Sequence, residues 1–228
     1  PGSHSKLGPH QPKDVPEILK EMIESLDKNV GRLVEYLEAE GLDKNTLIFF
    51  TSDNGQYLNY DGSTWPKVGS NGVLRGEKGD LYEGGHRVPA IAYWPEKIPE
   101  NVISNETLMS MDILPTLLEI IGSPMPNQNG NHALDGSSFL NVITQKKEMP
   151  ERTVFWKTPE AKAARMGDWK FIQDEINPEG ALYNLKSDLS ESKNLKLENS
   201  EVYQSLSQAM RKWEKEIVVS NLTATSEQ

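Results

Sequence analysis

TLIFFTSDNG at residues 46–55 and LRGEKGDLYEGGHRVPAIAYWP at residues 74–95 decide the fold. Residues 46–51 are apolar, β-branched or aromatic without polar alternation, which is typical of a strand buried on both faces of a parallel sheet. Residues 88–94 form a second apolar run of the same kind. The two runs predict an α/β protein in which a polar turn and a glycine-rich loop lie between two sheet strands.

Asp53 and Asn54 directly follow the first predicted strand. Ligands of open α/β sheets bind beyond the carboxyl ends of the strands. Both side chains offer hard oxygen atoms, which suit Ca²⁺ or Mg²⁺. The alternative is an ordinary Asn-Gly turn, but residues 56–67 lack the pattern of the partner strand that a tight hairpin needs.

Lys78 lies in the glycine-rich loop, between Gly76 and Gly79. Glycine lets the backbone come close to another group. A lysine ammonium is a compact positive charge that suits a tetrahedral anion. The alternative is a flexible basic loop without a ligand.

The two motifs together closely resemble the sulfatase family, within the alkaline-phosphatase-like superfamily. The resemblance implies that Asp53 and Asn54 bind calcium and that Lys78 binds the sulfate group. It also suggests a sulfate contact for His10, because PHQP is similar to the His-x-Pro segment of many sulfatases. The alternative for His10 is a solvated loop histidine.

A long amphipathic helix is predicted before the first strand. Asp14 begins it as an N-cap, apolar residues recur at spacings of three and four over residues 15–37, and Gly41 ends it as a left-handed cap. The apolar stripe is expected to pack into the core. The helix and the following strand form an αβ unit.

The C-terminal third predicts a small antiparallel sheet followed by a helix. Short strands are expected at residues 153–157, 163–166, 169–173 and 181–185, and an amphipathic helix at residues 202–217. The expected organisation is a flexible segment at residues 1–13, the C-terminal portion of the sulfatase α/β catalytic domain at 14–145, and a small α+β subdomain at 146–228. The fold class is therefore the C-terminal part of an alkaline-phosphatase-like sandwich with a small antiparallel sheet and a C-terminal helix.

Several polar residues near these motifs favour structural roles. Asp112 is expected to cap the helix at residues 111–122 rather than to act in catalysis. His86 favours a structural role, and Arg87 is expected to pair with a carboxylate such as Glu83.

The composition excludes several classes of function. The formal net charge is −10 and no basic stripe offsets it, which argues against a nucleic-acid partner. Any polyanionic substrate would need a local basic pocket. The chain has no cysteine, which excludes disulfides and thiolate sites. No apolar run is long enough to span a membrane. By resemblance alone, the compartment is periplasmic, secreted or lysosomal.

The resemblance extends from about residue 21 to the last helix but covers only the C-terminal half of a sulfatase. The family nucleophile is a formylglycine made from Cys or Ser in a C/S-x-P-x-R motif, and this sequence contains no such motif. The resemblance implies that this residue lies in a missing N-terminal half, which would be a partner of the chain. The implied reaction is hydrolysis of a sulfate ester of a small molecule or glycan, with attack by the hydrated aldehyde on sulfur. The chain alone is expected to be inactive.

Two other functions remain open from the sequence. A phosphoesterase of the same superfamily would bind a similar tetrahedral anion. A truncated, non-catalytic module would bind a partner or a sulfated glycan without cleaving it.

Overall fold

The computed structural model describes residues 15–58, 69–126 and 133–224 of the chain. The chain divides into two compact units, residues 1–94 and residues 95–228. The predicted boundary between residues 145 and 146 falls inside the second unit and stays a prediction, and the predicted flexible segment at residues 1–13 lies outside the described residues.

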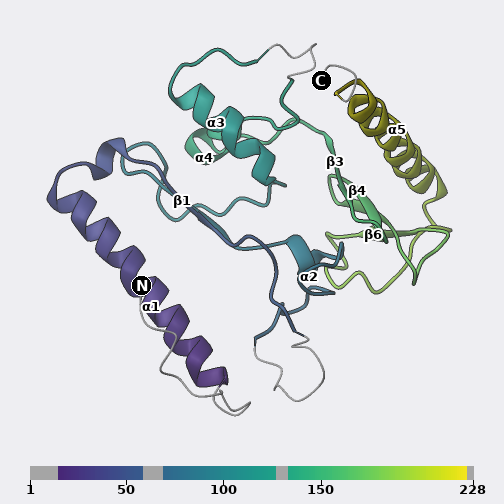
Figure 1. The fold of residues 1–228 in the computed structure, drawn as a ribbon, viewed down its shortest axis with the longest axis horizontal. Coiled ribbons are helices and arrows are strands. Elements are labelled where there is room, and N and C mark those ends of the chain that lie inside the picture. The colour runs from purple at the N-terminus through teal and green to yellow at the C-terminus, as the bar shows by residue number, and fades with distance from the viewer. Residues whose placement is uncertain (1–14, 59–68, 127–132, 225–228) are drawn as a thin grey trace. The chain divides into compact units, whose positions relative to one another are not determined.

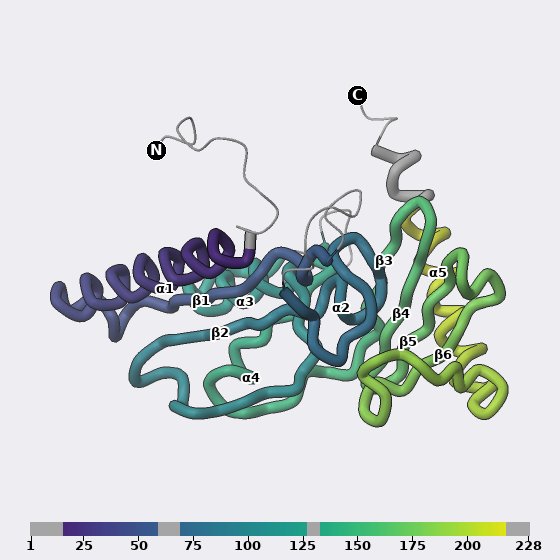
Figure 2. The backbone as a smooth tube through the Cα atoms, turned by 90° about the horizontal axis from the view of Figure 1, so that it is seen from below, coloured from purple at the N-terminus to yellow at the C-terminus, as the bar shows by residue number. Residues whose placement is uncertain are grey.

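The first unit is built around a two-stranded sheet. Helix α1 (Val15–Ala39) and a 3-10 turn, η3 (Asp43–Asn45), lead into strand β1 (Ile48–Thr51), and a one-turn helix, α2 (Glu83–His86), precedes strand β2 (Ala90–Tyr93). The two strands pair antiparallel, with Ile48 opposite Tyr93 and Thr51 opposite Ala90. Figure 2 shows the two strands side by side.

The expectation of parallel strands buried on both faces is wrong for this structure. The pair is antiparallel, and the large side chains of Phe50, Ile91 and Tyr93 are exposed. An apolar run without alternation shows that both faces of a strand favour burial, but it does not identify the segment that covers them. Among the described residues, this sheet has only these two strands, fewer than a doubly wound sheet.

Helix α1 forms as its period predicts, and Gly41 closes it with a φ of 67°. The expected core packing of its stripe is wrong over much of the helix. Met22, Ile23 and Leu26 are more than half exposed, at 62%, 58% and 52%. The helix therefore presents an apolar face that few described residues cover.

The second unit combines two short helices with a four-stranded sheet. A 3-10 turn, η4 (Ser110–Asp112), continues into α3 (Ile113–Ile120), and α4 (Leu140–Gln145) follows. The sheet is an antiparallel meander with the order β3-β4-β5-β6. Its strands are β3 (Thr153–Lys157), β4 (Lys162–Met166), β5 (Trp169–Gln173) and β6 (Ala181–Asn184). The predicted small antiparallel sheet is confirmed, and Gly167, at a φ of 56°, makes the tight turn between β4 and β5.

The main core of the second unit lies between this sheet and the C-terminal helix, α5 (Ser200–Ala224). Figure 1 shows the helix alongside β3 and β4, and it also packs against β5. Phe171 and Leu182 from the sheet pack against Leu206 and Met210 from the helix, and all four are buried. The predicted amphipathic helix is thereby confirmed, and its apolar stripe is covered.

A buried ion pair ties the sheet to the loop that follows β6. Lys170 Nζ lies 2.9 Å from Glu191 Oε1, and both side chains are fully buried. Glu191 has a φ of 48°, a strained value for a non-glycine residue. Asp188 holds the loop in this shape by accepting hydrogen bonds from the backbone N–H of Ser192 and Lys193, at 2.8 and 2.9 Å.

We expect Leu206→Ala to destabilise the second unit by about 2–5 kcal/mol, because it leaves a cavity in a packed core. Leu197→Ala is the matched control, since Leu197 is 91% exposed and its truncation should change stability by less than about 0.5 kcal/mol. Urea denaturation followed by tryptophan fluorescence measures both. Equal midpoints for the two variants would contradict this account of the core.

Glu214 on α5 bridges two lysines of the β3–β4 hairpin. Its oxygens lie 2.6 Å from Lys157 Nζ and 2.9 Å from Lys162 Nζ. Burial alone raises the pKa of Glu214, but the two lysines outweigh it and hold the pKa below its ordinary value of 4.5. The ionised form is therefore favoured by folding, and this contribution is lost as the pH falls below about 4.5 through the lower folded pKa.

Wild-type protein should accordingly be more stable than Glu214→Gln at pH 7, and the difference should shrink as the pH falls toward 3. Thermal unfolding of both proteins across this range gives the measurement. Glu216→Gln is the control, because Glu216 is mostly exposed and meets Lys212 only at 3.9 Å. A difference between wild type and Glu214→Gln that does not change with pH would exclude this role for the ion pairs.

Candidate functional site

Strand β1 ends at a turn that carries two of the predicted ligands. Asp53 is exposed and Asn54 is half-buried. Asn54 Nδ2 donates to the carbonyl of Gly55 at 2.9 Å, and Ser52 Oγ donates to the carbonyl of Asn54 at 2.9 Å. The bond from Nδ2 restricts the orientation of the Asn54 amide.

The turn is joined to the glycine-rich segment through Gly55. The N–H of Gly55 donates to the carbonyl of Gly85 at 2.9 Å. A Cβ on Gly55 would lie 1.8 Å from the carbonyl oxygen of Gly84, a distance that no side chain tolerates. Because only glycine permits this approach, the Asn-Gly sequence here serves packing between two segments as well as chain reversal.

The lysine loop is fastened to the same turn. The N–H of Lys78 donates to the carbonyl of Gln56 at 3.2 Å, two residues after Asn54. Gly76, at a φ of 82°, provides the backbone bend, and the N–H of Glu77 donates to Asp80 Oδ2 at 2.8 Å. Lys78 itself is exposed. The structure thus brings the backbones of the Asp53–Asn54 turn and the lysine loop together, although 22 residues separate Lys78 from Gln56 in the chain.

His10 lies outside the described residues. The ligand roles predicted for Asp53, Asn54 and Lys78 stay predictions, although all three residues lie on the two joined segments. Calcium takes roughly six to eight oxygen ligands. Over the described ranges, no group of three or more His, Cys, Asp or Glu side chains could hold a metal ion. The Asp53 carboxylate and the Asn54 amide oxygen are ligand types that a hard cation prefers, but they supply only part of its coordination shell.

The segment before β2 is buried and held by charged groups. Glu83 is fully buried, and its carboxylate lies 3.4 Å from Arg87 Nη1 and 3.8 Å from His86 Nε2. The expected pairing of Arg87 with Glu83 is confirmed, and the contacts of His86 fit the structural role expected for it. The guanidinium of Arg75 lies over the ring of Tyr82, 3.9 Å from its centre. These contacts fix the backbone that receives Gly55.

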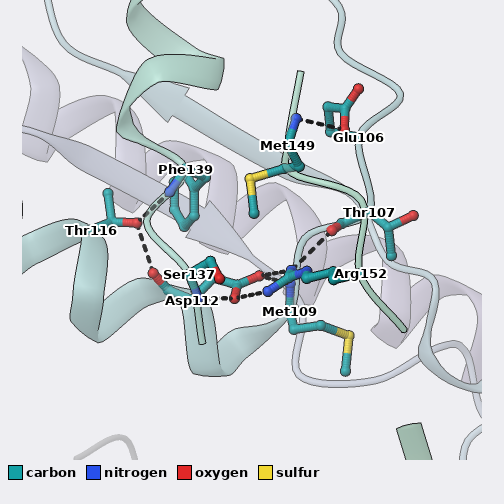
Figure 3. Close-up of polar contacts among 9 residues, drawn as sticks. All are labelled: Glu106, Thr107, Met109, Asp112, Thr116, Ser137, Phe139, Met149 and Arg152. Atoms are coloured by element: carbon teal, nitrogen blue, oxygen red, sulfur yellow. Dashed lines mark hydrogen bonds and ion pairs between the residues drawn. The ribbon is translucent and has the colours of Figure 1, made fainter. Parts of the chain in front are cut away.

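In the second unit, a buried carboxylate organises the backbone around α3 (Figure 3). Asp112 accepts hydrogen bonds from the N–H of Met109 at 2.7 Å and of Ser137 at 2.9 Å, and it pairs with both terminal nitrogens of Arg152. Arg152 also donates to the carbonyl of Thr107 at 3.2 Å. A carboxylate with four donors is saturated. Asp112 stands at the N-cap position of α3, but its side chain makes no capping hydrogen bond to that helix, so the expected capping role is wrong. Its carboxylate instead serves structure by joining the chain around residues 109, 137 and 152.

Four polar contacts were not predicted from the sequence. They are the bonds of Asn71 to Gln56 and Gly76, the bond of Glu77 to the N–H of Leu58, and the pairing of Arg152 with Asp112. Asn71 precedes Gly72, which by pattern indicates only a turn. Three of these contacts join residues 15 to 40 positions apart, which leaves no periodic signal in a single sequence.

Residues 19–123 match the Sulfatase family model, and residues 76–217 match the model of the N-sulphoglucosamine sulphohydrolase C-terminal region. The chain belongs to the sulfatase family, and the predicted fold class is confirmed.

Most of the chain is similar to known proteins, both in sequence and in three-dimensional structure. A sulfatase of Formosa agariphila is 32% identical over 201 residues, covering 78% of this chain and 35% of its own length. The crystal structure of Ps i-CgsB in complex with k-i-k-neocarrahexaose has a TM-score of 0.72 at 27% identity, covering 84% of this chain and 41% of that one. The structure of BT4656 with its substrate D-glucosamine-2-N,6-O-disulfate has a TM-score of 0.65 at 26% identity, covering 85% and 39%. The chain thus spans well under half the length of these proteins.

We expect Gly55→Ala to separate the two loops, because the added Cβ cannot fit against Gly84. Overpacking of this kind costs about 1–3 kcal/mol or more. Gly31→Ala in α1 is the control, since nothing lies within 4 Å of its Cβ and helix propensity should make it about 0.5–1 kcal/mol more stable. Urea denaturation followed by circular dichroism compares them. A Gly55→Ala protein as stable as Gly31→Ala would contradict the close approach.

Proposed function

We propose that this chain supplies the metal-binding and sulfate-binding part of a sulfuric ester hydrolase. The observation that carries the proposal is the hydrogen bond from the N–H of Lys78 to the carbonyl of Gln56, which holds the lysine loop against the Asp53–Asn54 turn. Family membership supports the same chemistry.

Each residue of this site has a distinct role in the proposal. The Lys78 ammonium binds a sulfate oxygen and stabilises the negative charge that develops in the transition state. Asp53 and the amide oxygen of Asn54 hold the metal ion. Calcium, when bound, supplies positive charge that neutralises the sulfate oxygens, and Mg²⁺ is an alternative. His10 is proposed as a further contact to the sulfate group.

A second protein segment completes the site in this proposal. It carries the formylglycine nucleophile and the remaining metal ligands, because the chain has no C/S-x-P-x-R motif and its described residues hold no group of three or more His, Cys, Asp or Glu that could bind a metal ion. The exposed apolar faces of α1 and of the β1–β2 pair support the same view, since such faces are stable only when covered. This segment is the missing N-terminal half of the catalytic domain.

The proposed substrates are sulfate esters of carbohydrates or of small aryl molecules. Two similar structures hold sugar ligands, a neocarrahexaose and a glucosamine disulfate. The net charge of −10 makes local cations such as Lys78 necessary for binding a sulfated glycan. No helix within the described ranges has the length and hydropathy to span a membrane. We propose a periplasmic, secreted or lysosomal location by family membership.

The test compares the chain alone with a hybrid enzyme. In the hybrid, this chain replaces the stretch that it matches in the Formosa agariphila sulfatase. The chain alone should not hydrolyse an aryl sulfate, and the hybrid should do so in a calcium-dependent manner. Metal-dependent turnover by the chain alone would contradict the need for a second segment.

Lys78→Ala in the hybrid should lower kcat/KM by about a hundredfold to a thousandfold, which is typical for the loss of one stabilising charge. Lys212→Ala is the control, because Lys212 is exposed on α5. A folded hybrid that cleaves aryl phosphate but not aryl sulfate would favour the phosphoesterase alternative. A folded hybrid that binds a sulfated glycan without cleaving any ester would favour the non-catalytic module.

A further inference from the structure

The side chain of Asn71 contacts both loops of the proposed site. Its Oδ1 accepts a hydrogen bond from the N–H of Gln56 at 2.9 Å. Its Nδ2 donates to the carbonyl of Gln56 at 3.2 Å and to the carbonyl of Gly76 at 2.9 Å. One amide group therefore bonds the residue two positions after Asn54 and the residue two positions before Lys78.

The arrangement copies the pairing of a neighbouring strand. Asn71 engages both the N–H and the carbonyl of Gln56, as a strand residue would across a ladder. The carbonyl of Gln56 receives two donors, Asn71 Nδ2 and the N–H of Lys78. The Gln56 peptide thus connects the Asp53–Asn54 turn, Asn71 and the lysine loop.

A second contact supports the same segment. The carboxylate of Glu77 accepts a hydrogen bond from the N–H of Leu58, and the N–H of Glu77 is itself bonded to Asp80. Of the two residues before Lys78, Gly76 is therefore bonded to Asn71 and Glu77 is bonded to Leu58. The exposed ammonium of Lys78 projects from a backbone that is fixed on its N-terminal side.

We propose that Asn71 is a positioning residue, which fixes the separation between the Asp53–Asn54 metal turn and Lys78. It acts through Gln56 and Gly76 and contacts neither substrate nor metal. The inference rests on the proposed function, because it assigns Asn71 to the same site. Small displacements of a charged group from its productive position can cost about a hundredfold in rate.

The first measurement is amide hydrogen exchange in the 228-residue chain, which does not depend on activity. Asn71→Ala should raise exchange at the amides of Gln56 and Lys78 by about tenfold or more, through local opening, and leave β4 and β5 unchanged. Asn71→Asp keeps the acceptor for Gln56 but replaces the donor with an oxygen that faces two carbonyls. It should expose the Lys78 amide while Gln56 stays more protected than in Asn71→Ala.

Asn29→Ala is the matched control for a lost asparagine side chain. Asn29 Nδ2 donates to a backbone carbonyl, that of Ser25, at 2.7 Å on the exposed surface of α1. Its substitution should leave exchange at Gln56 and Lys78 unchanged.

The second measurement is steady-state kinetics of the hybrid enzyme. If Asn71 positions the lysine for the transition state, Asn71→Ala should lower kcat by about tenfold to a hundredfold and change KM by less than about threefold. A purely structural residue would lower the amount of active enzyme and the melting temperature without a larger loss of kcat per active site. Active-site titration and a thermal melt separate the two cases.

Faster exchange at Gln56 and Lys78 together with a selective loss of kcat would support the inference. Unchanged exchange in both Asn71 variants would overturn it, and so would faster exchange with an unchanged kcat. A folded hybrid that is inactive with Asn71 intact contradicts the proposed function instead, and the exchange results alone then decide whether Asn71 holds the two loops together.

Discussion

The site depends on one backbone contact, in which Gly55 lies against Gly84 and Gly85. The Asp53–Asn54 turn can approach the glycine-rich segment only because Gly55 has no Cβ, which would lie 1.8 Å from the carbonyl oxygen of Gly84. A hydrogen bond of 2.9 Å from the N–H of Gly55 to the carbonyl of Gly85 then fixes the position of the turn along the glycine-rich segment. Next to this contact, Gln56 is bonded both to Asn71 and to the N–H of Lys78.

Local patterns predicted the elements whose packing is complete within the second unit. Strands β3 to β6 and helix α5 lie close to their predicted ranges, because alternation, turn glycines and helical spacing all agree there. In the first unit, the pattern identified strands and a helix correctly but gave the wrong burial. Phe50 and Met22 are apolar but exposed, and periodicity does not say which segment, of this chain or another, would cover an apolar face.

The sequence motifs predicted the candidate site residues. They did not predict the residues that hold the backbone of the site and of its surroundings in place. Asp53, Asn54 and Lys78 stand in segments with recognisable spacing, so the sequence singles them out. Asn71 has no such signal, because its function arises from an amide that meets Gln56 across 15 residues. Arg152 likewise meets Asp112 across 40 residues. Side-chain to backbone contacts of this range become visible only in three dimensions.

The most direct measurement of the central claim is crystallography of the hybrid enzyme with calcium and sulfate added. We expect anomalous density for calcium beside the Asp53 carboxylate and the Asn54 amide oxygen, with a sulfate oxygen within hydrogen-bond distance of Lys78 Nζ. Calcium bound by other residues, or a sulfate held without Lys78, would contradict a single site shared by the two loops.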